Sequence, residues 1–236
     1  MKRILFFIVF LFFIKGVAFS EFQSDWSLGY FFNTDTYGSL ERSFNGLSIN
    51  MNLRYLFTEN IGLFIGGDFK TWFSADNNNY LNRFGITGTN FTFEDGGGSG
   101  VKLDLNLGLA FALPLNERFQ LQSDLGVSFT LYYIDSISGE VTYMGSQSSF
   151  LIQPDNVSSI GFYSSIFGRY LIRSFLNEIT GRIRRTYLTF GLRMDYKFTR
   201  EESGRIVFGT WGSYSIEESN FSGFSIAPFI GGMVSF

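Results

Sequence analysis

The strongest constraint on the fold of this chain is an alternation of apolar and polar residues that persists over ten or more positions. From Val101 to Phe111, one face carries valine, leucines and phenylalanine, and the other carries lysine, aspartate, asparagine, glycine and alanine. Successive side chains of a β-strand point to opposite faces, so this pattern predicts a strand with one apolar face. A soluble strand has about five or six residues, whereas a tilted membrane strand needs about nine to eleven. The length of the alternation therefore predicts strands that cross a membrane.

Eight segments carry the pattern, four of them clearly and four weakly. The clear segments are 47–55, 101–111, 119–133 and 188–198, and the weaker ones are 24–32, 61–72, 206–215 and 224–236. Short polar connectors at 58–60, 114–118 and 199–205 alternate with mostly longer ones at 33–45, 73–100, 135–184 and 216–223. Outer-membrane barrels combine short periplasmic turns with long external loops. This order predicts an all-β fold, a single closed antiparallel up-and-down transmembrane β-barrel of eight strands, with both chain ends in the periplasm.

The segment 135–184 leaves a ten-stranded barrel open as the alternative. Residues 141–152 and 160–172 could form two more strands around a turn at 153–156. However, the first of these segments would place serine, glycine or glutamine at the middle of the membrane, and apolar residues from Leu171 to Ile179 recur at helical spacing. We therefore expect one long external loop that carries a hairpin or a short helix, and eight strands.

Residues 1–20 have the layout of a secretory signal peptide. Lys2 and Arg3 precede an unbroken apolar run at 4–14, and the small-residue sequence Ala-Phe-Ser ends at Ser20. A helix over that run would reach only about 16 Å, against about 30 Å for the core of a bilayer, which argues against a membrane anchor. We expect a signal peptide at 1–20 that is cleaved off, and an outer-membrane β-barrel domain at 21–236.

The charge balance argues against a nucleic-acid partner. The segment 1–20 contains three basic residues and no acidic one, so its removal takes the formal net charge of the chain from −3 to −6. A nucleic-acid-binding protein needs a basic face, and this chain is mildly acidic. The chain has no cysteine, which excludes both disulfides and a lipid attached to an N-terminal cysteine.

The chain also has no histidine. Without histidine and cysteine, it lacks the usual activated nucleophiles and the preferred ligands for zinc and most transition metals. We therefore expect no enzyme activity, no cofactor and no metal site, with a carboxylate-only mechanism or a serine–lysine pair as the chemistry that remains open.

Charged residues recur on the polar face of the predicted strands, five of them positive and four negative. An eight-stranded barrel is just wide enough for side chains to fill its interior, and an unpaired buried charge is costly. The charges are therefore expected to pair with one another in a plugged lumen. If 135–184 is a loop, Asp124 and Arg193 lie on neighbouring strands and pair directly. The nine lumen residues are Arg54, Asp68, Lys70, Lys102, Asp104, Asp124, Arg193, Asp195 and Lys197.

Three arginines lie just before the strand at 188–198, namely Arg182, Arg184 and Arg185. In the predicted topology they are at the external rim, where the forked guanidinium matches the phosphate oxygens of lipids. A solvated loop base is the alternative for these residues.

The last residues of the chain, Met233 to Phe236, complete a resemblance to the small bacterial outer-membrane barrels, the OmpA-, OmpX- and OmpW-like families. The resemblance spans residues 21–236 and consists of the signal peptide, the alternating strands and the contrast between short turns and long loops. In that class, a terminal phenylalanine that closes an alternating strand resembles the signal read by the barrel-assembly machinery. Phe236 is therefore the candidate assembly signal, although Gly232 and Pro228 on the same face depart from the usual pattern.

The resemblance implies a protein of the bacterial outer membrane whose partners are membrane lipids and the barrel-assembly machinery. The paired lumen charges and the long loops favour a structural function: a plugged barrel that presents external loops for adhesion or other surface interaction. The alternative is a narrow porin, or an OmpW-like transporter or binder of a small apolar ligand.

Overall fold

The structure is a computed structural model that describes residues 21–37, 40–76, 90–93, 98–143, 145–176, 183–209 and 212–236. These residues form strands joined by turns, and the predicted signal peptide at 1–20 lies outside them. No helix in this part of the chain has the length and apolarity needed to span a membrane. The strands are β1 (Glu21–Tyr37), β2 (Leu40–Leu56), β3 (Ile61–Asp76), β4 (Asn90–Phe93), β5 (Gly100–Pro114), β6 (Phe119–Ile134), β7 (Ile137–Tyr143), β8 (Ser146–Pro154), β9 (Val157–Leu176), β10 (Ile183–Phe208) and β11 (Gly212–Ser235).

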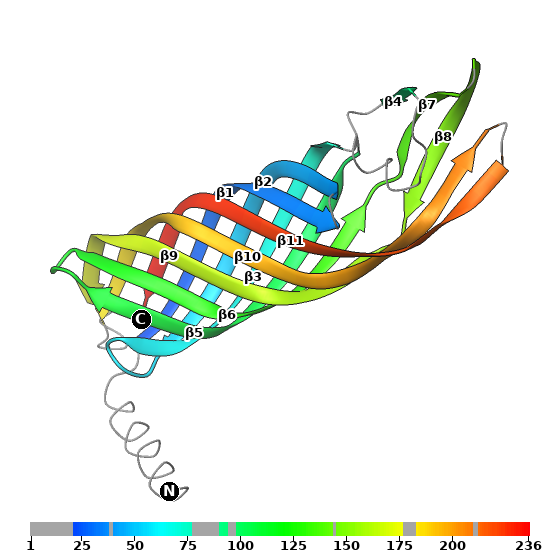
Figure 1. Cartoon of the computed structure of the whole chain (residues 1–236). Helices are drawn as coiled ribbons and strands as arrows, with labels where there is room; N and C mark the ends of the chain where they lie inside the picture. Colours follow the sequence, from blue (N-terminus) through cyan, green and yellow to red (C-terminus); the bar gives the residue numbers. More distant parts are fainter. Residues whose placement is uncertain are drawn as a thin grey trace, which may run out of the picture.

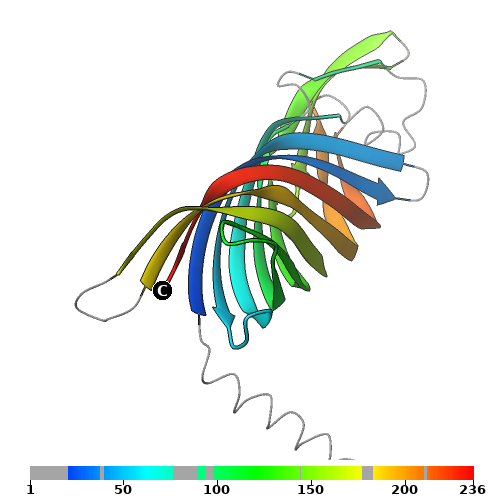
Figure 2. The same cartoon turned by 90° about the vertical axis from the view of Figure 1, so that its left-hand side faces the viewer.

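Eight of these strands form a closed antiparallel ring (Figures 1 and 2). Its order is β1, β2, β3, β5, β6, β9, β10 and β11, and β11 pairs again with β1. Following the partner of Gln23 from strand to strand round the ring leads to Asn33, ten residues further along β1. Such a stagger requires the strands to tilt against the barrel axis, and the tilt is visible in Figure 1.

The predicted eight-stranded barrel is confirmed, but one predicted strand position is wrong and one strand of the ring was not predicted. Residues of β9, which the sequence placed in a loop, pair with β6 on one side and β10 on the other. The inward face of β9 carries Val157, Tyr163 and Phe167, so apolar residues occur on both faces and obscure the period of two. Conversely, 206–215 is no separate barrel strand, because it contains the end of β10 and the beginning of β11.

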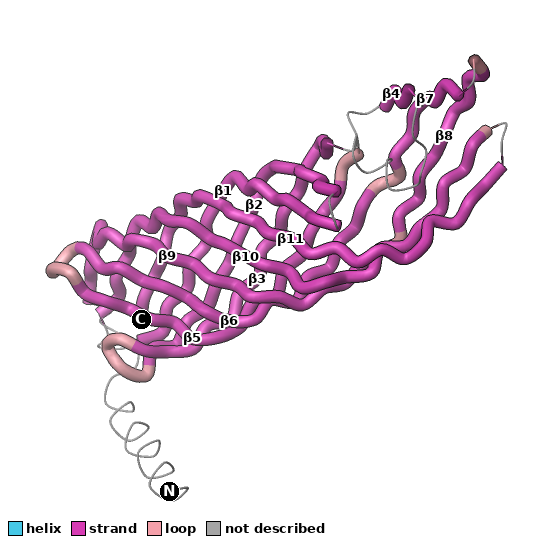
Figure 3. Tube along the Cα trace, viewed as in Figure 1, coloured by secondary structure: helices cyan, strands magenta, loops and turns pink. Residues whose placement is uncertain are grey.

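At one end of the ring, β10 and β11 continue beyond it, and together with β8, β7 and β4 they form an open extension of the same sheet, which we call the extension sheet (Figure 3). There, the outer part of β10 pairs with β8, β8 pairs with β7, and β7 pairs with β4. The hairpin of β7 and β8 is the hairpin expected within 135–184, and it lies outside the ring, which excludes the ten-stranded alternative. The connector predicted at 199–205 is part of β10, where it belongs to this extension sheet.

The two ends of the barrel differ. The turns at 57–60 and 115–118 lie at the end that also carries Glu21 and Phe236, which we call the terminal end. The extension sheet lies at the opposite, loop end (Figure 1). Arg184 and Arg185 lie near the beginning of β10, and Arg185 pairs with Ser235, so they lie at the terminal end, whereas the predicted topology placed them at the opposite end of the barrel. Arg182 is outside the described residues.

The outside of the ring is apolar and the inside is polar. Leu103, Leu105, Leu107 and Leu109 of β5 point outward and are 38–49% exposed, while Asp104 and Asn106 between them are buried. In hydrocarbon every backbone polar group must find a partner within the protein, and a closed ring of strands meets that requirement. An apolar outer face around a polar interior is the arrangement of a transmembrane barrel.

Candidate functional site

The lumen contains all nine charged residues that the alternation had placed on the inner face. They come from β2, β3, β5, β6 and β10, and none is more than 5% exposed. A charge buried in this way is stable only when an opposite charge or hydrogen-bond partner lies close to it. The arrangement of these partners defines the candidate site.

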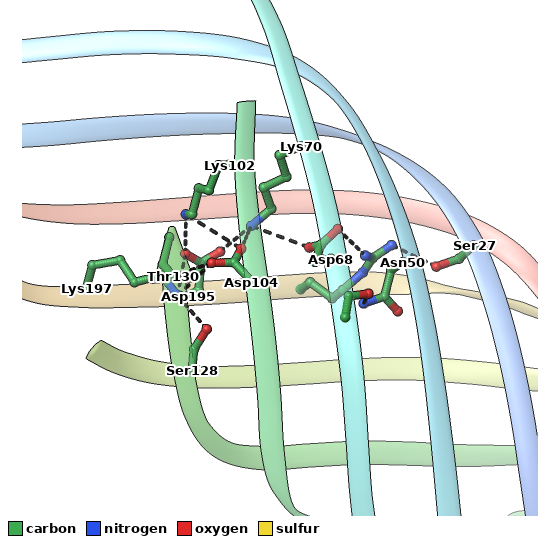
Figure 4. Close-up of polar contacts among 12 residues, drawn as sticks. Ser27, Asn50, Asp68, Lys70, Lys102, Asp104, Ser128, Thr130, Asp195 and Lys197 are labelled. Atoms are coloured by element: carbon green, nitrogen blue, oxygen red, sulfur yellow. Dashed lines mark hydrogen bonds and ion pairs between the residues drawn. The ribbon is translucent and has the colours of Figure 1, made fainter. Parts of the chain in front are cut away.

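Three lysines converge on two aspartates near the loop end of the lumen (Figure 4). The Nζ atom of Lys70 lies 2.6 Å from Asp195 and 3.1 Å from Asp104. Lys102 lies 2.7 Å from Asp195, and Lys197 lies 3.0 Å from Asp104. We call these five residues the lysine cluster. Because each lysine comes from a different strand, the cluster ties β3, β5 and β10 together across the lumen.

Asp68 and Arg193 continue this network toward β1. Asp68 lies 3.4 Å from the Nζ atom of Lys70 and 3.3 Å from the Nη1 atom of Arg193. Arg193 also donates a hydrogen bond from Nη2 to Ser27 Oγ at 2.8 Å, and its guanidinium lies 4.4 Å from the centre of the Phe229 ring. The lysine cluster, Asp68 and Arg193 therefore form one connected network (Figure 4).

Arg54 holds a second group of charges nearer the terminal end. It donates from Nε and Nη2 to the two carboxylate oxygens of Asp124, at 2.8 and 2.6 Å, and from Nη1 to Asp25. The predicted pair of Asp124 with Arg193 is therefore wrong. It assumed that β6 and β10 are neighbours, whereas β9 lies between them and Arg54 reaches Asp124 from β2.

Five further charged residues line the lumen that the sequence reasoning did not select. Arg169 pairs with Glu21 at 3.3 Å, and Arg42 pairs with Asp35 at 3.0 Å. The fifth is Asp25, which alternates with outward-facing Trp26, so the period of two already contained its signal. Arg169 was missed because β9 had been taken for a loop. The buried charged side chains of the described residues then number seven positive and seven negative, and each belongs to an ion pair.

Apolar side chains fill the lumen on either side of the lysine cluster. Toward the loop ends of the strands lie Phe31, Phe44, Trp72, Tyr132, Val157 and Ala227, and toward the terminal ends lie Leu56, Phe64, Ala110, Ala112 and Tyr163, followed by Phe167, Tyr187 and Met233. Trp72 and Tyr132 are 3% and 0% exposed. On the terminal side these residues are interleaved with the Arg54 group, whose guanidinium lies 4.8 Å from the centre of the Phe167 ring, and on the loop side Arg42 lies 5.7 Å from the centre of the Phe44 ring.

A hollow of about 660 Å³ lies at the wall of the barrel, near the point where β9 leaves β10. The last pair between these strands is Gly161 with Lys197, and Ser159 beyond it donates a hydrogen bond to the carbonyl oxygen of Phe198 at 3.2 Å. Six of the lining residues are apolar and exposed on the outer face, and the others are polar. The lining consists of Leu103, Asp104, Leu105, Phe129, Thr130, Leu131, Ser158, Ser159, Ile160 and Phe198.

Phe236 and the rim arginines lie apart from the lumen. The backbone of Phe236 exchanges two hydrogen bonds with Phe22, at 2.9 and 3.3 Å, which closes the seam between β11 and β1 at the terminal end. The guanidinium of Arg184 lies 4.8 Å from the centre of the Phe236 ring. Within the part of the chain that the structure describes, no group of three or more histidine, cysteine, aspartate or glutamate side chains is placed to hold a metal ion.

No protein-family model matches this chain, and neither does any curated protein. Among solved structures, it is similar to Neisserial surface protein A, with 16% identity over 92% of this chain and 97% of that one and a TM-score of 0.40. It is also similar to the outer membrane protein OprG from Pseudomonas aeruginosa, with 13% identity, coverage of 92% and 96%, and a TM-score of 0.48. A third is the outer membrane protease OmpT from Escherichia coli, with 11% identity, coverage of 92% and 97%, and a TM-score of 0.43.

These likenesses are distant, and the proteins that show them differ in their roles. The assignment of this chain therefore depends on its own closed ring of strands, its apolar outer face and its polar interior. On those features, it is an integral β-barrel of the bacterial outer membrane.

Proposed function

We propose that this barrel is a sealed membrane anchor that presents an extramembrane β-sheet for contacts at the cell surface. The observation that carries the proposal is the pairing of every buried charge in the lumen, seven positive with seven negative, among the described residues. Charges that are held by one another at 2.6–3.4 Å are not available to coordinate a passing ion.

The apolar layers support the same reading. Phe31, Trp72 and Tyr132 on one side and Phe64, Tyr163 and Phe167 on the other are at most 4% exposed. Hydrated ions cross an apolar constriction poorly, because they would have to give up water without gaining polar partners. Eight strands enclose only enough space for such side chains.

The extension sheet supports a role at the surface. The strands β10 and β11 have 26 and 24 residues, whereas a tilted strand crosses the hydrocarbon with about nine to eleven. They therefore extend well beyond the membrane, and β8 is hydrogen-bonded to β10 from Gly204 to Phe208. Val141 and Ile152 of the hairpin are 1% and 0% exposed, so the extension has a packed face of its own.

The orientation and the route of assembly belong to the same proposal. Residues 1–20 direct export through the inner membrane and are removed, the terminal end lies in the periplasm, and the loop end faces outward. Phe236 serves the barrel-assembly machinery as its recognition signal. Protease added to intact cells is expected to cut within 135–156, and cleavage that requires permeabilised cells would contradict this orientation.

Removal of the β7–β8 hairpin tests the surface role. A variant in which a short glycine–serine linker replaces residues 136–155 keeps every strand of the ring. We expect it to reach the outer membrane and to lose most of the adherence that the full chain confers on expressing bacteria, measured on cultured epithelial cells and on polystyrene. A variant with linker inserted into the turn at 115–118, at the terminal end, is the control. Equal adherence of the hairpin-deleted and full-length proteins would refute the role in surface contact.

The hollow in the wall favours a second candidate function, which is the binding of a small apolar ligand. Its exposed leucine, isoleucine and phenylalanine side chains face the membrane, and Ser158 and Thr130 provide polar groups beside them. Quenching by a fluorescent apolar probe such as 1-aminoanthracene in detergent tests this function, with Leu131→Trp as the reporter. Saturable quenching that Ile160→Arg abolishes supports the candidate, and non-saturable quenching argues against it.

A further inference from the structure

Two outward-facing arginines flank one phenylalanine at the terminal rim of the barrel. Arg173 lies near the end of β9 and Arg184 near the beginning of β10, where Arg184 is paired with Phe175. The guanidinium of Arg173 lies 5.7 Å from the centre of the Phe175 ring, and that of Arg184 lies 5.9 Å from it. Both distances are within the range of a cation–π contact. Both guanidinium groups therefore contact the same aromatic ring.

A β-bulge puts Arg173 on this outer face. The register between β9 and β10 shifts by one residue at Ile172, since Leu171 pairs with Tyr187 and Arg173 pairs with Thr186. Tyr187 is buried in the lumen, so its neighbour Thr186 and the partner of Thr186 point outward. Without the bulge, Arg173 would share the inward face of Leu171. The bulge thus directs the side chain of Arg173 to the outer face instead of into the lumen.

Phe236 extends the same outer row. Arg184 also lies 4.8 Å from the centre of the Phe236 ring, which lies 6.3 Å from the ring of Phe22. A guanidinium that lies over an aromatic face keeps its N–H groups directed outward in the plane, where they match the oxygens of a phosphate. Tyr170 and Ile172 beside the row are 42% and 62% exposed, as expected of residues that contact lipid.

Neither arginine forms an ion pair with a described carboxylate. Glu21, at the beginning of β1, points into the lumen and is bound to Arg169 at 3.3 Å. Two like charges near the low-dielectric edge of a membrane repel each other, and an anion between them removes that repulsion. An anionic group beside the two arginines would therefore be stabilised at the terminal edge of the apolar outer face.

We propose that Arg173 and Arg184 bind the phosphate of a phospholipid in the periplasmic leaflet, with Phe175 and Phe236 against its glycerol and upper acyl carbons. We expect the ligand to be a lipid and not soluble phosphate, because the outward-facing residues on both sides of the two arginines belong to the apolar, lipid-facing surface of the barrel. The inference depends on the orientation proposed above but not on a sealed lumen, so a conducting barrel would leave it intact.

Native mass spectrometry of the full chain in detergent tests the site, with phosphatidylglycerol as the probe and diacylglycerol as the phosphate-free comparison. We expect the wild type to retain phosphatidylglycerol, and Arg173→Gln/Arg184→Gln to bind it about tenfold or more weakly, given the loss of two interfacial charges. Arg205→Gln, which removes an exposed arginine from the loop end of β10, is the matched control and should bind as the wild type does.

Three outcomes would overturn the proposal. They are equal retention by the double variant and the wild type, equal retention of diacylglycerol, and displacement of the lipid by millimolar inorganic phosphate. Arg173→Lys/Arg184→Lys provides a second test if the glutamine variant does not fold, because it keeps both charges and loses the planar fork. Its affinity is expected between those of the wild type and the glutamine variant, and an unchanged affinity would reject recognition by the guanidinium groups.

Discussion

The rings of Phe64 and Tyr163 lie with their centres 5.5 Å apart, although two strands separate β3 from β9. The four residues of this row are Phe64, Gly108, Gly126 and Tyr163, each paired with the next. The two glycines leave space on the inner wall, and the aromatic rings meet over it. This contact helps to close the terminal side of the lumen.

A methyl group on Gly126 is expected to destabilise the barrel. Its Cβ atom would meet the backbone of Leu107 and Gly108, which cannot move without disturbing the β5–β6 pairing. Gly126→Ala should lower the free energy of unfolding in bilayers by about 1–3 kcal/mol. Gly67→Ala is the control, because its nearest atom would be 3.8 Å away. Equal stability of the two variants would argue against close approach at the glycine pair.

Arg54 is expected to contribute most of its stabilising effect through Asp25 and Asp124. Arg54→Ala leaves two carboxylates in the lumen without their partner, and breaking a buried pair in this way costs about 3–5 kcal/mol. The variant Arg54→Ala/Asp124→Asn should recover part of that loss in urea titrations of the bilayer-inserted protein, because one unpaired charge is gone. Additive effects of the two substitutions would contradict the direct pairing.

A charge on the outer face tests which side of β5 meets lipid. Leu107 is 42% exposed and lies midway along the outward row of that strand. Leu107→Arg should lower stability in bilayers by about 2–4 kcal/mol. Leu115→Arg, in the turn at the terminal end, should have a much smaller effect because the residue is near water. If both changes cost the same, the outer face has been assigned wrongly.

Phe236 has two proposed roles, as a ring that packs at the β1–β11 seam and as the signal for the barrel-assembly machinery. Comparison of the Phe236 deletion with Phe22→Ala separates them. Both changes remove the ring contact at the β1–β11 seam, but only the deletion removes the terminal residue. We expect a lower outer-membrane yield for the deletion in cells and nearly normal yield for Phe22→Ala. Quantitative immunoblots of outer-membrane fractions measure both, and normal yield of the deletion variant would exclude the assembly signal.

The period of two predicted the ring, its strand number and the direction of most side chains, because the membrane imposes an apolar outer face on every strand. It failed at β9, where aromatic residues fill the lumen and both faces become apolar. It failed again at 199–208, because a strand outside the membrane needs no apolar face.

The lumen partners could not be predicted in the same way. Alternation gives the face on which Asp124 lies, but its partner is set by which strands are neighbours and by the reach of Arg54 across the lumen. The mistaken position of β9 therefore produced both the wrong partner for Asp124 and the wrong rim for Arg184. Long-range pairings of this kind follow from the ring as a whole.

Single-channel recording in planar bilayers tests the central claim, the sealed lumen, most directly. Purified full-length protein, refolded and shown to be inserted by its resistance to protease, is expected to give no resolved conductance steps in 1 M KCl, while an open porin added to the same bilayer gives clear ones. Regular, ohmic steps that scale with the amount of protein would contradict the account, because they would require a continuous water path past the lysine cluster and both apolar layers.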